Sequence, residues 1–124
     1  MNTVLQIHNQ AMDLTEEAAL CQRQGTSARA TVLLQQAFEL ERQAAAMLEF
    51  KHEAEPTRAV LYRSAASLAL DCRNYREAER LIAKALIGNP PEEIAEELRE
   101  LLAQVYAERR QHAQAKPAAH GALT

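Results

Sequence analysis

The chain has 124 residues, of which 48% are hydrophobic, 25% are charged and only 4% are aromatic, and its net charge is −3. This length allows a single domain with a buried core that needs no metal or disulfide. The negative charge, and the lack of a basic stripe with interleaved aromatic residues, argue against a nucleic-acid-binding protein.

Strong helix formers dominate the sequence, whereas it contains only three glycines and four prolines. No segment alternates polar and apolar residues long enough for a strand, so we predict an all-α fold. No apolar run is long enough to span a bilayer, and the first residues do not resemble a signal peptide. We therefore expect a cytoplasmic protein in which Cys21 and Cys72 are buried, reduced thiols.

The first two helices are expected over residues 3–24 and 27–52. Gly25 separates them, because glycine readily adopts the left-handed conformation that follows many helices. Thr26 or Ser27 is expected to cap the second helix, which contains no breaker. Its apolar residues are too widely spread for one narrow seam, so we expect this helix to pack on two sides.

Pro56 opens the third helix at a position where its missing N–H is not needed. Either Glu55 or Thr57 is expected to supply local capping. This helix is predicted to run to about Arg73, followed by a turn and a fourth helix over residues 75–87.

A fifth helix is predicted from Pro91 to about residue 108. Its apolar stripe is expected to face the core: Ile94, Leu98, Leu101, Leu102 and Val105. From Arg109 the apolar pattern fades. We therefore predict a helical domain of residues 1–108 and a frayed or disordered tail of residues 109–124.

The third and fourth predicted helices carry small residues at fixed places. The pattern reads Tyr62-x2-Ala65-Ala66-x2-Ala69, then Ala78-x3-Ile82, then Pro90. Small residues let two helices cross closely, and neighbouring large residues fill the remaining space. The segment Ala59–Pro90 resembles a tetratricopeptide repeat, whose pattern is W-x2-L-G-x2-Y, then A-x3-F, then P.

The first helix pair is a weaker copy of the second, over residues 10–52. The correspondence has a constant separation of 48 residues and pairs Leu14, Ala18, Cys21, Gly25, Ala30, Leu34 and Ala37 with Tyr62, Ala66, Ala69, Arg73, Ala78, Ile82 and Ala85. A tetratricopeptide array has a shorter period, and a second helix about four turns longer than its counterpart is expected to absorb the difference. Two alternatives are a generic antiparallel helical bundle and, for the first pair, a hairpin of the microtubule-interacting-and-transport type.

The resemblance implies a concave groove that binds another protein or a peptide, with the fifth helix as a capping helix. The implied groove residues are Met12, Thr15, Ala19, Gln22 and Arg23 on the first helix, and Val60, Arg63, Ser67, Leu70 and Asp71 on the third. Arg63 would suit an acidic or C-terminal peptide. A surface ion pair is the alternative role of this arginine.

The second helix suggests a different kind of partner. Apolar residues lie on several of its sides, and one neighbouring hairpin is not expected to cover Phe38, Leu40, Met47 and Phe50. Because exposed apolar patches commonly mark interfaces, we expect self-association through this helix, as a homodimer. A self-associating structural protein is accordingly the alternative to an adaptor.

No catalytic, cofactor or metal site is predicted. The three glycines stand apart, so they form no phosphate-binding loop, and the glutamates of the fifth helix are interpreted as a solvated acidic face. We expect a protein-interaction module rather than an enzyme. An enzyme with an unrecognised site is the least favoured alternative.

Overall fold

A computed structural model describes residues 3–114, and within this range the chain forms five α-helices, one short 3-10 helix and no strand. The elements are α1 (Val4–Arg23), α2 (Ser27–Ala46), η1 (His52–Ala54), α3 (Thr57–Asp71), α4 (Tyr75–Leu86) and α5 (Glu92–Gln114). The predicted all-α fold is confirmed. None of these helices has both the length and the apolar character needed to cross a membrane.

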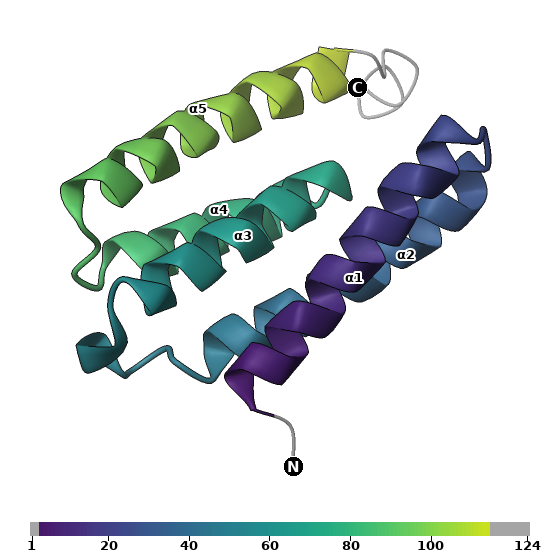
Figure 1. The fold of residues 1–124 in the computed structure, drawn as a ribbon. Coiled ribbons are helices and arrows are strands. Elements are labelled where there is room, and N and C mark those ends of the chain that lie inside the picture. Colours follow the sequence, from purple (N-terminus) through teal and green to yellow (C-terminus); the bar gives the residue numbers. More distant parts are fainter. Residues whose placement is uncertain (1–2, 115–124) are drawn as a thin grey trace.

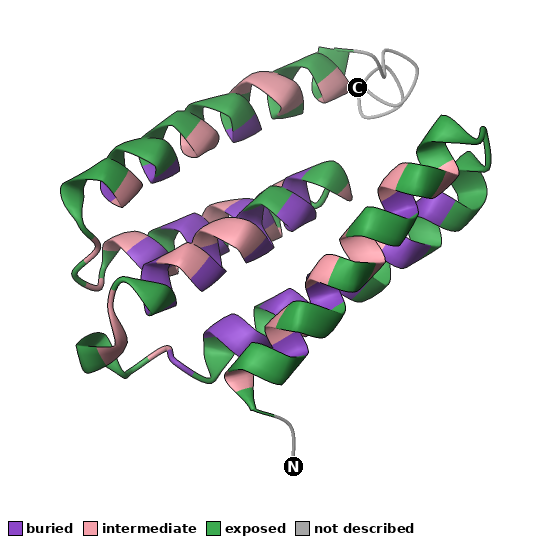
Figure 2. Ribbon diagram, viewed as in Figure 1, coloured by how far each residue is buried: buried purple, intermediate pink, exposed green. Residues whose placement is uncertain are grey.

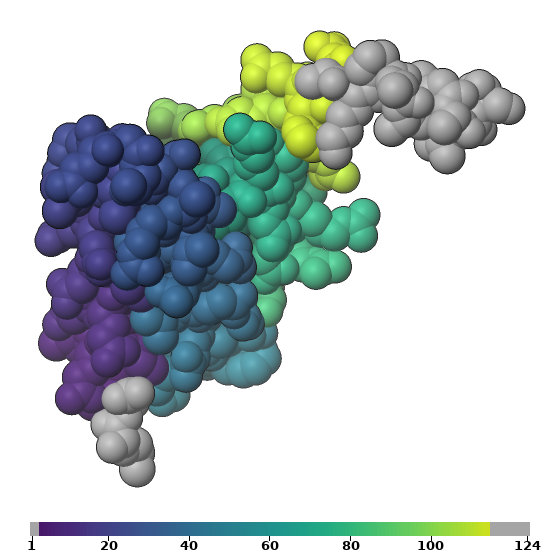
Figure 3. Space-filling view, turned by 90° about the vertical axis from the view of Figure 1, so that its right-hand side faces the viewer, coloured from purple at the N-terminus to yellow at the C-terminus, as the bar shows by residue number. Residues whose placement is uncertain are grey.

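The helices form two antiparallel hairpins and a final helix (Figure 1). α1 pairs with α2, α3 pairs with α4, and the packing of α2 against α3 joins the hairpins. α5 packs along α4 and also contacts α3. In the space-filling view, the purple-to-blue α1–α2 hairpin stands against the teal α3–α4 hairpin (Figure 3). This order leaves α3 between α1 and α5.

The two hairpins turn in the same way. Gly25 and Arg73, which are 48 residues apart, both have a positive φ, of 81° and 59° respectively. The following amide donates to the carbonyl five positions earlier in each hairpin, Thr26 to Cys21 at 2.9 Å and Asn74 to Ala69 at 2.8 Å. Such left-handed closures satisfy carbonyls at helix ends. The 48-residue correspondence is therefore present in the backbone as well as in the sequence.

Replacing Arg73 by glycine is expected to stabilise the protein. A positive φ strains residues that carry a Cβ, whereas glycine adopts it freely, so the free energy of unfolding should rise by about 0.5–1 kcal/mol. Gly25→Ala, at the equivalent position, should lower it by a similar amount. Urea titrations of both variants would measure the two changes, and a gain with Gly25→Ala would contradict the shared turn.

The second helix ends earlier than predicted. α2 stops at Ala46, and η1 and the loops around it lead to α3. Tertiary contact explains the early end, because the Glu49 carbonyl accepts a hydrogen bond from Arg58 Nε at 2.8 Å. With 20 residues against 12 in α4, α2 is about two turns longer than its counterpart, and the connector supplies the remaining length. Thr26, one of the two residues predicted to cap this helix, is its N-cap residue, but its side chain makes no cap bond and its hydroxyl donates to the Cys21 carbonyl at 3.0 Å.

The fifth helix continues further than predicted, to Gln114, so the predicted boundary at residue 108 is wrong. Contacts with α4 hold this last part. The ring of His112 lies 5.9 Å from that of Tyr75, and Arg109 Nη1 lies 3.5 Å from a carboxylate oxygen of Glu79. These polar contacts replace the apolar stripe that the sequence lacks here. The remainder of the predicted tail, residues 115–124, lies outside the described residues.

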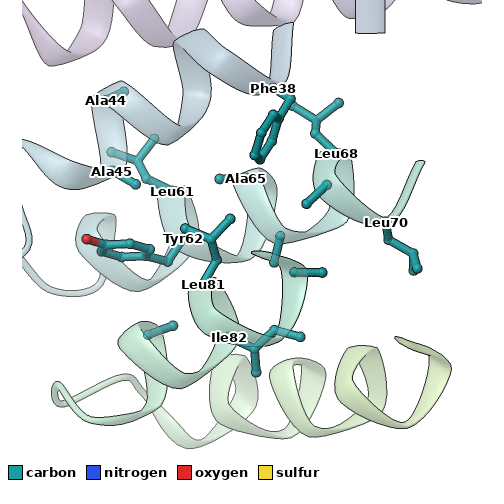
Figure 4. Close-up of a cluster of buried hydrophobic side chains, with 14 of the residues drawn as sticks. Phe38, Ala44, Ala45, Leu61, Tyr62, Ala65, Leu68, Leu70, Leu81 and Ile82 are labelled. Carbon is teal, nitrogen blue, oxygen red and sulfur yellow. The ribbon is translucent and has the colours of Figure 1, made fainter. Parts of the chain in front are cut away.

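The core lies where the hairpins meet: Figure 2 shows the buried parts of the helices in purple, and Figure 4 shows buried side chains gathered between the helices. The predicted stripes of α3 and α4 are fully buried: Tyr62, Ala65, Ala66, Ala69, Ala78, Ile82 and Ala85. Of the predicted α5 stripe, Leu98 and Val105 are buried and the others are half-buried against the core. Cys21 and Cys72 are free and half-buried, so the expectation of full burial is not met. Burial raises the pKa of the Cys72 thiol, as does the negative charge of Asp71.

Ala78→Leu tests the close packing between α3 and α4. Ala66 and Ala78 are both 0% exposed in the same core cluster. A leucine at position 78 has no free space, so the free energy of unfolding should fall by about 1–3 kcal/mol. Thermal or urea unfolding would measure this decrease in stability. Ala83→Leu, at an exposed position of α4, is the control. An unchanged stability would contradict this packing.

A buried arginine joins α3 to the ends of α2 and α4. Arg58 is 1% exposed, and its guanidinium donates to the carbonyls of Glu49 and Lys84, both at 2.8 Å. Glu55 completes the arrangement: it lies 3.7 Å from Arg58 Nη1 and accepts from the amides of Ala59 at 3.0 Å and Asn89 at 2.8 Å. Glu55 therefore caps α3, which settles the choice that the sequence left open. A Cβ on Gly88 would collide with the Arg58 guanidinium, so this position accepts only glycine without rearrangement.

A second buried polar pair joins α1 to α2. Glu41 is 0% exposed, and His8 Nδ1 lies 2.9 Å from both of its carboxylate oxygens. The His8 side chain is 28% exposed and therefore connects the buried carboxylate to the surface. Sequence analysis did not single out either residue.

Candidate functional site

A cleft of about 500 Å³ opens between α1, α3 and α5. We call it the α1–α3–α5 groove. α3 supplies its floor and the other two helices supply its walls, as the order of helices in Figure 1 allows. Its lining residues are Met12 and Thr15 from α1; Arg63, Ser64, Ser67, Leu68 and Asp71 from α3; and Glu97, Glu100, Leu101 and Gln104 from α5.

The predicted groove residues mostly come together here. Five of them line the groove: Met12, Thr15, Arg63, Ser67 and Asp71. Ala19 and Gln22 line a smaller hollow of about 270 Å³ that shares Thr15 and Asp71 with the groove, so the two form one continuous surface.

Three predicted residues do not belong to this surface. Leu70 is 5% exposed and packs in the core, because α3 is surrounded by α2, α4 and α5 and buries more than one side. Val60 lines a separate hollow between the first turns of α1 and α3. Arg23 is exposed at the end of α1, outside the groove. The prediction is wrong for Leu70 and misplaces Val60 and Arg23.

The wall that α5 supplies was not predicted as part of the site. Glu97, Glu100 and Gln104 follow one another at helical spacing, beside the half-buried Leu101. This acidic edge next to an apolar stripe was the available signal. Helical spacing alone places Glu97 and Glu100 on the solvent-facing side, because the docking of α5 beside α1 and α3 depends on contacts distant in the chain.

Charges in the groove are unequally paired. Arg63 forms an ion pair with Glu97, so the alternative role predicted for this arginine is present. Asp71 and Glu100 have no ion-pair partner among residues 3–114. Arg63 is the one cation that the described part of the chain places in the groove, and it is already paired. The groove therefore presents uncompensated negative charge beside the apolar surface of Met12, Leu68 and Leu101.

Asp71 is exposed at the end of α3, and the pKa of its carboxyl is shifted from the ordinary value. Burial, and secondarily the negative charge of Glu108, raises the pKa of the Asp71 carboxyl. The charged carboxylate is therefore disfavoured in the folded protein relative to the unfolded chain.

Asp71→Asn should therefore stabilise the protein at neutral pH. Because the pKa is raised on folding, the folded state binds this proton more tightly, and the contribution of Asp71 to stability falls as pH rises above the unfolded-state pKa. The difference in melting temperature between the Asn variant and the wild type should grow from about pH 4 to pH 6 and then level off. A constant difference across that range would contradict the assignment.

The predicted self-association residues do not form one surface. Phe38 is 2% exposed and packs in the core where α2 meets α3, and Leu40 is half-buried against the same core. The expectation that Phe38 needs an external partner is wrong. Met47 and Phe50 lie beyond the end of α2 and are 41% and 86% exposed.

Comparisons with protein-family models, with curated proteins and with solved structures found no match. Within residues 3–114, no three histidine, cysteine, aspartate or glutamate side chains are grouped as a metal site would require. The geometry of the α1–α3–α5 groove is therefore the basis for a functional assignment.

Proposed function

We propose that this protein is a small adaptor whose α1–α3–α5 groove binds a segment of another protein. The observation that carries the proposal is the convergence of residues from three helices on one cleft. Its volume of about 500 Å³ lies within the range of roughly 300–1,000 Å³ that is usual for ligand pockets. Apolar atoms of Met12, Leu68 and Leu101 offer hydrophobic contact, and the hydroxyls of Ser64 and Ser67 offer hydrogen bonds.

The repeated turn supports the view that the two hairpins are tetratricopeptide-like units, with α5 as the capping helix. In such arrays the first helices of successive units line the binding surface, and here α1 and α3 occupy those places. Among residues 3–114, no histidine lines the groove beside Ser64 or Ser67, so this lining favours binding over nucleophilic catalysis. A cytoplasmic location belongs to the same proposal and agrees with two free thiols.

A peptide selection tests the groove as a binding site. A random peptide library displayed on phage would be selected on the full chain, and the enriched peptides would be measured against Ser67→Trp and Gln10→Trp. Both positions are exposed, but only Ser67 lies in the groove, where tryptophan would fill the floor. Loss of binding with Ser67→Trp alone is the expected result. Peptides that bind both variants equally well would contradict the proposal.

Self-association is a second candidate, and the exposure of Phe50 favours it. An aromatic side chain that is 86% exposed, close to the 41% exposed Met47, is the kind of surface that a second copy covers. Light scattering at tens of micromolar would show a dimer that Phe50→Ser converts to a monomer. A monomeric wild type would rule out self-association and would leave the proposal that the groove binds a partner unaffected.

A further inference from the structure

We propose that the segment recognised by the α1–α3–α5 groove is basic, an extended or helical stretch of a partner protein that carries lysine or arginine beside apolar residues. This inference rests on the proposed function and specifies its partner. It is the opposite of the acidic peptide that the position of Arg63 suggested from the sequence.

Arg63 is already engaged by a carboxylate of the groove. Among residues 3–114 it is the only cation in the groove lining, and its guanidinium pairs with Glu97 on the α5 wall. To pair with Arg63, an acidic ligand would have to break the Arg63–Glu97 ion pair. The carboxylate of Glu97 would then lie unpaired beside the negative charge of the ligand. The Arg63–Glu97 ion pair therefore disfavours the binding of an acidic ligand.

The groove also carries carboxylates outside the Arg63–Glu97 ion pair. Asp71 on the floor and Glu100 on the wall lack ion-pair partners among residues 3–114, and Glu108 adds negative charge next to Asp71. A cationic side chain entering the groove would meet this uncompensated charge and relieve the repulsion between Asp71 and Glu108. Charge complementarity of this kind selects partners and excludes those of like charge.

The groove also has an apolar surface. Met12 lines it from α1, Leu101 from α5 and Leu68 from α3, so charged and apolar side chains share one lining. A segment with only charged residues would leave this apolar surface uncovered. An alternation of apolar and basic residues satisfies both parts of the groove, and the apolar contacts provide affinity that salt does not screen.

Two synthetic peptides test the inference directly. One repeats Gly-Leu-Lys, and the other repeats Gly-Leu-Glu at the same length, so they share the apolar residues and differ only in charge. Isothermal titration into the full-length protein at low salt should show binding of the lysine peptide at least about tenfold tighter than that of the glutamate peptide. The difference should narrow as salt is added.

Charge reversal locates the binding. The double variant Asp71→Lys/Glu100→Lys should bind the lysine peptide about tenfold more weakly than wild type. Asp13→Lys/Glu16→Lys is the matched control, because it changes the net charge equally at exposed α1 positions that do not line the groove. Lysine at position 71 also suits the end of α3, where the helix dipole favours positive charge, so the variant should fold.

The outcomes separate this inference from the proposed function. Equal losses in the two double variants would show attraction to the net charge alone and overturn the inference. If groove-dependent peptides from the library prove acidic or uncharged, the inference is wrong and the adaptor proposal stands. If no peptide loses binding with Ser67→Trp, both are wrong.

Discussion

Arg58→Ala is expected to lower the free energy of unfolding by about 3–5 kcal/mol. The substitution removes the donor that satisfies the carbonyls of Glu49 and Lys84, and it leaves the carboxylate of Glu55 without its cation. It also removes the guanidinium that lies 5.1 Å from the centre of the Tyr62 ring. Urea unfolding followed by circular dichroism would measure the loss.

Two further variants distinguish the causes of that loss. Arg58→Lys keeps the charge but not the fork of donors, so it should recover only part of the stability. Tyr62→Phe keeps the ring and removes a buried hydroxyl that has no hydrogen-bond partner among residues 3–114, so it should change stability little. A loss below about 1 kcal/mol with Arg58→Ala would show that the bridge is not a structural element, since buried pairs of this kind contribute more.

The second large effect is expected at the buried Glu41. His8→Leu removes the only side chain within hydrogen-bond distance of this carboxylate among residues 3–114 and should lower the free energy of unfolding by about 2–3 kcal/mol. This loss of stability arises because the Glu41 carboxylate stays buried without a partner, and not from the lost contact with His8 alone.

A double variant checks that explanation. His8→Leu/Glu41→Met replaces both partners by apolar side chains of similar size, and such replacements are often neutral. It should therefore be more stable than His8→Leu alone. Equal destabilisation of the single and double variants, measured by urea unfolding, would instead point to a loss of packing around α1.

The sequence predicted what local chemistry determines. Gly25 marks a turn because of its own backbone, and Pro56 marks a helix start for the same reason. The stripe that includes Ala66 and Ala78 followed from helical spacing alone. Each of these signals lies within a few residues of the feature it specifies, so no knowledge of distant contacts was needed.

The features that escaped prediction depend on partners distant in the chain. Arg58 and Glu41 are charged, and charged residues are rarely buried unless they pair with a specific partner. Lys84, which accepts from Arg58, is 26 positions away, and His8 is 33 positions from Glu41. In the groove, the α3 floor followed from helical spacing, whereas the α5 wall depended on where a whole helix docks.

The order in which the helices pack also bears on how the chain folds. Each helix packs mainly against the helix before or after it in the sequence, so most native contacts close short loops. Chains with this low contact order fold fast, because little entropy is lost before the first contacts form. Both hairpins are local in sequence, so each can form its own contacts before α2 docks on α3 and α5 docks on α4.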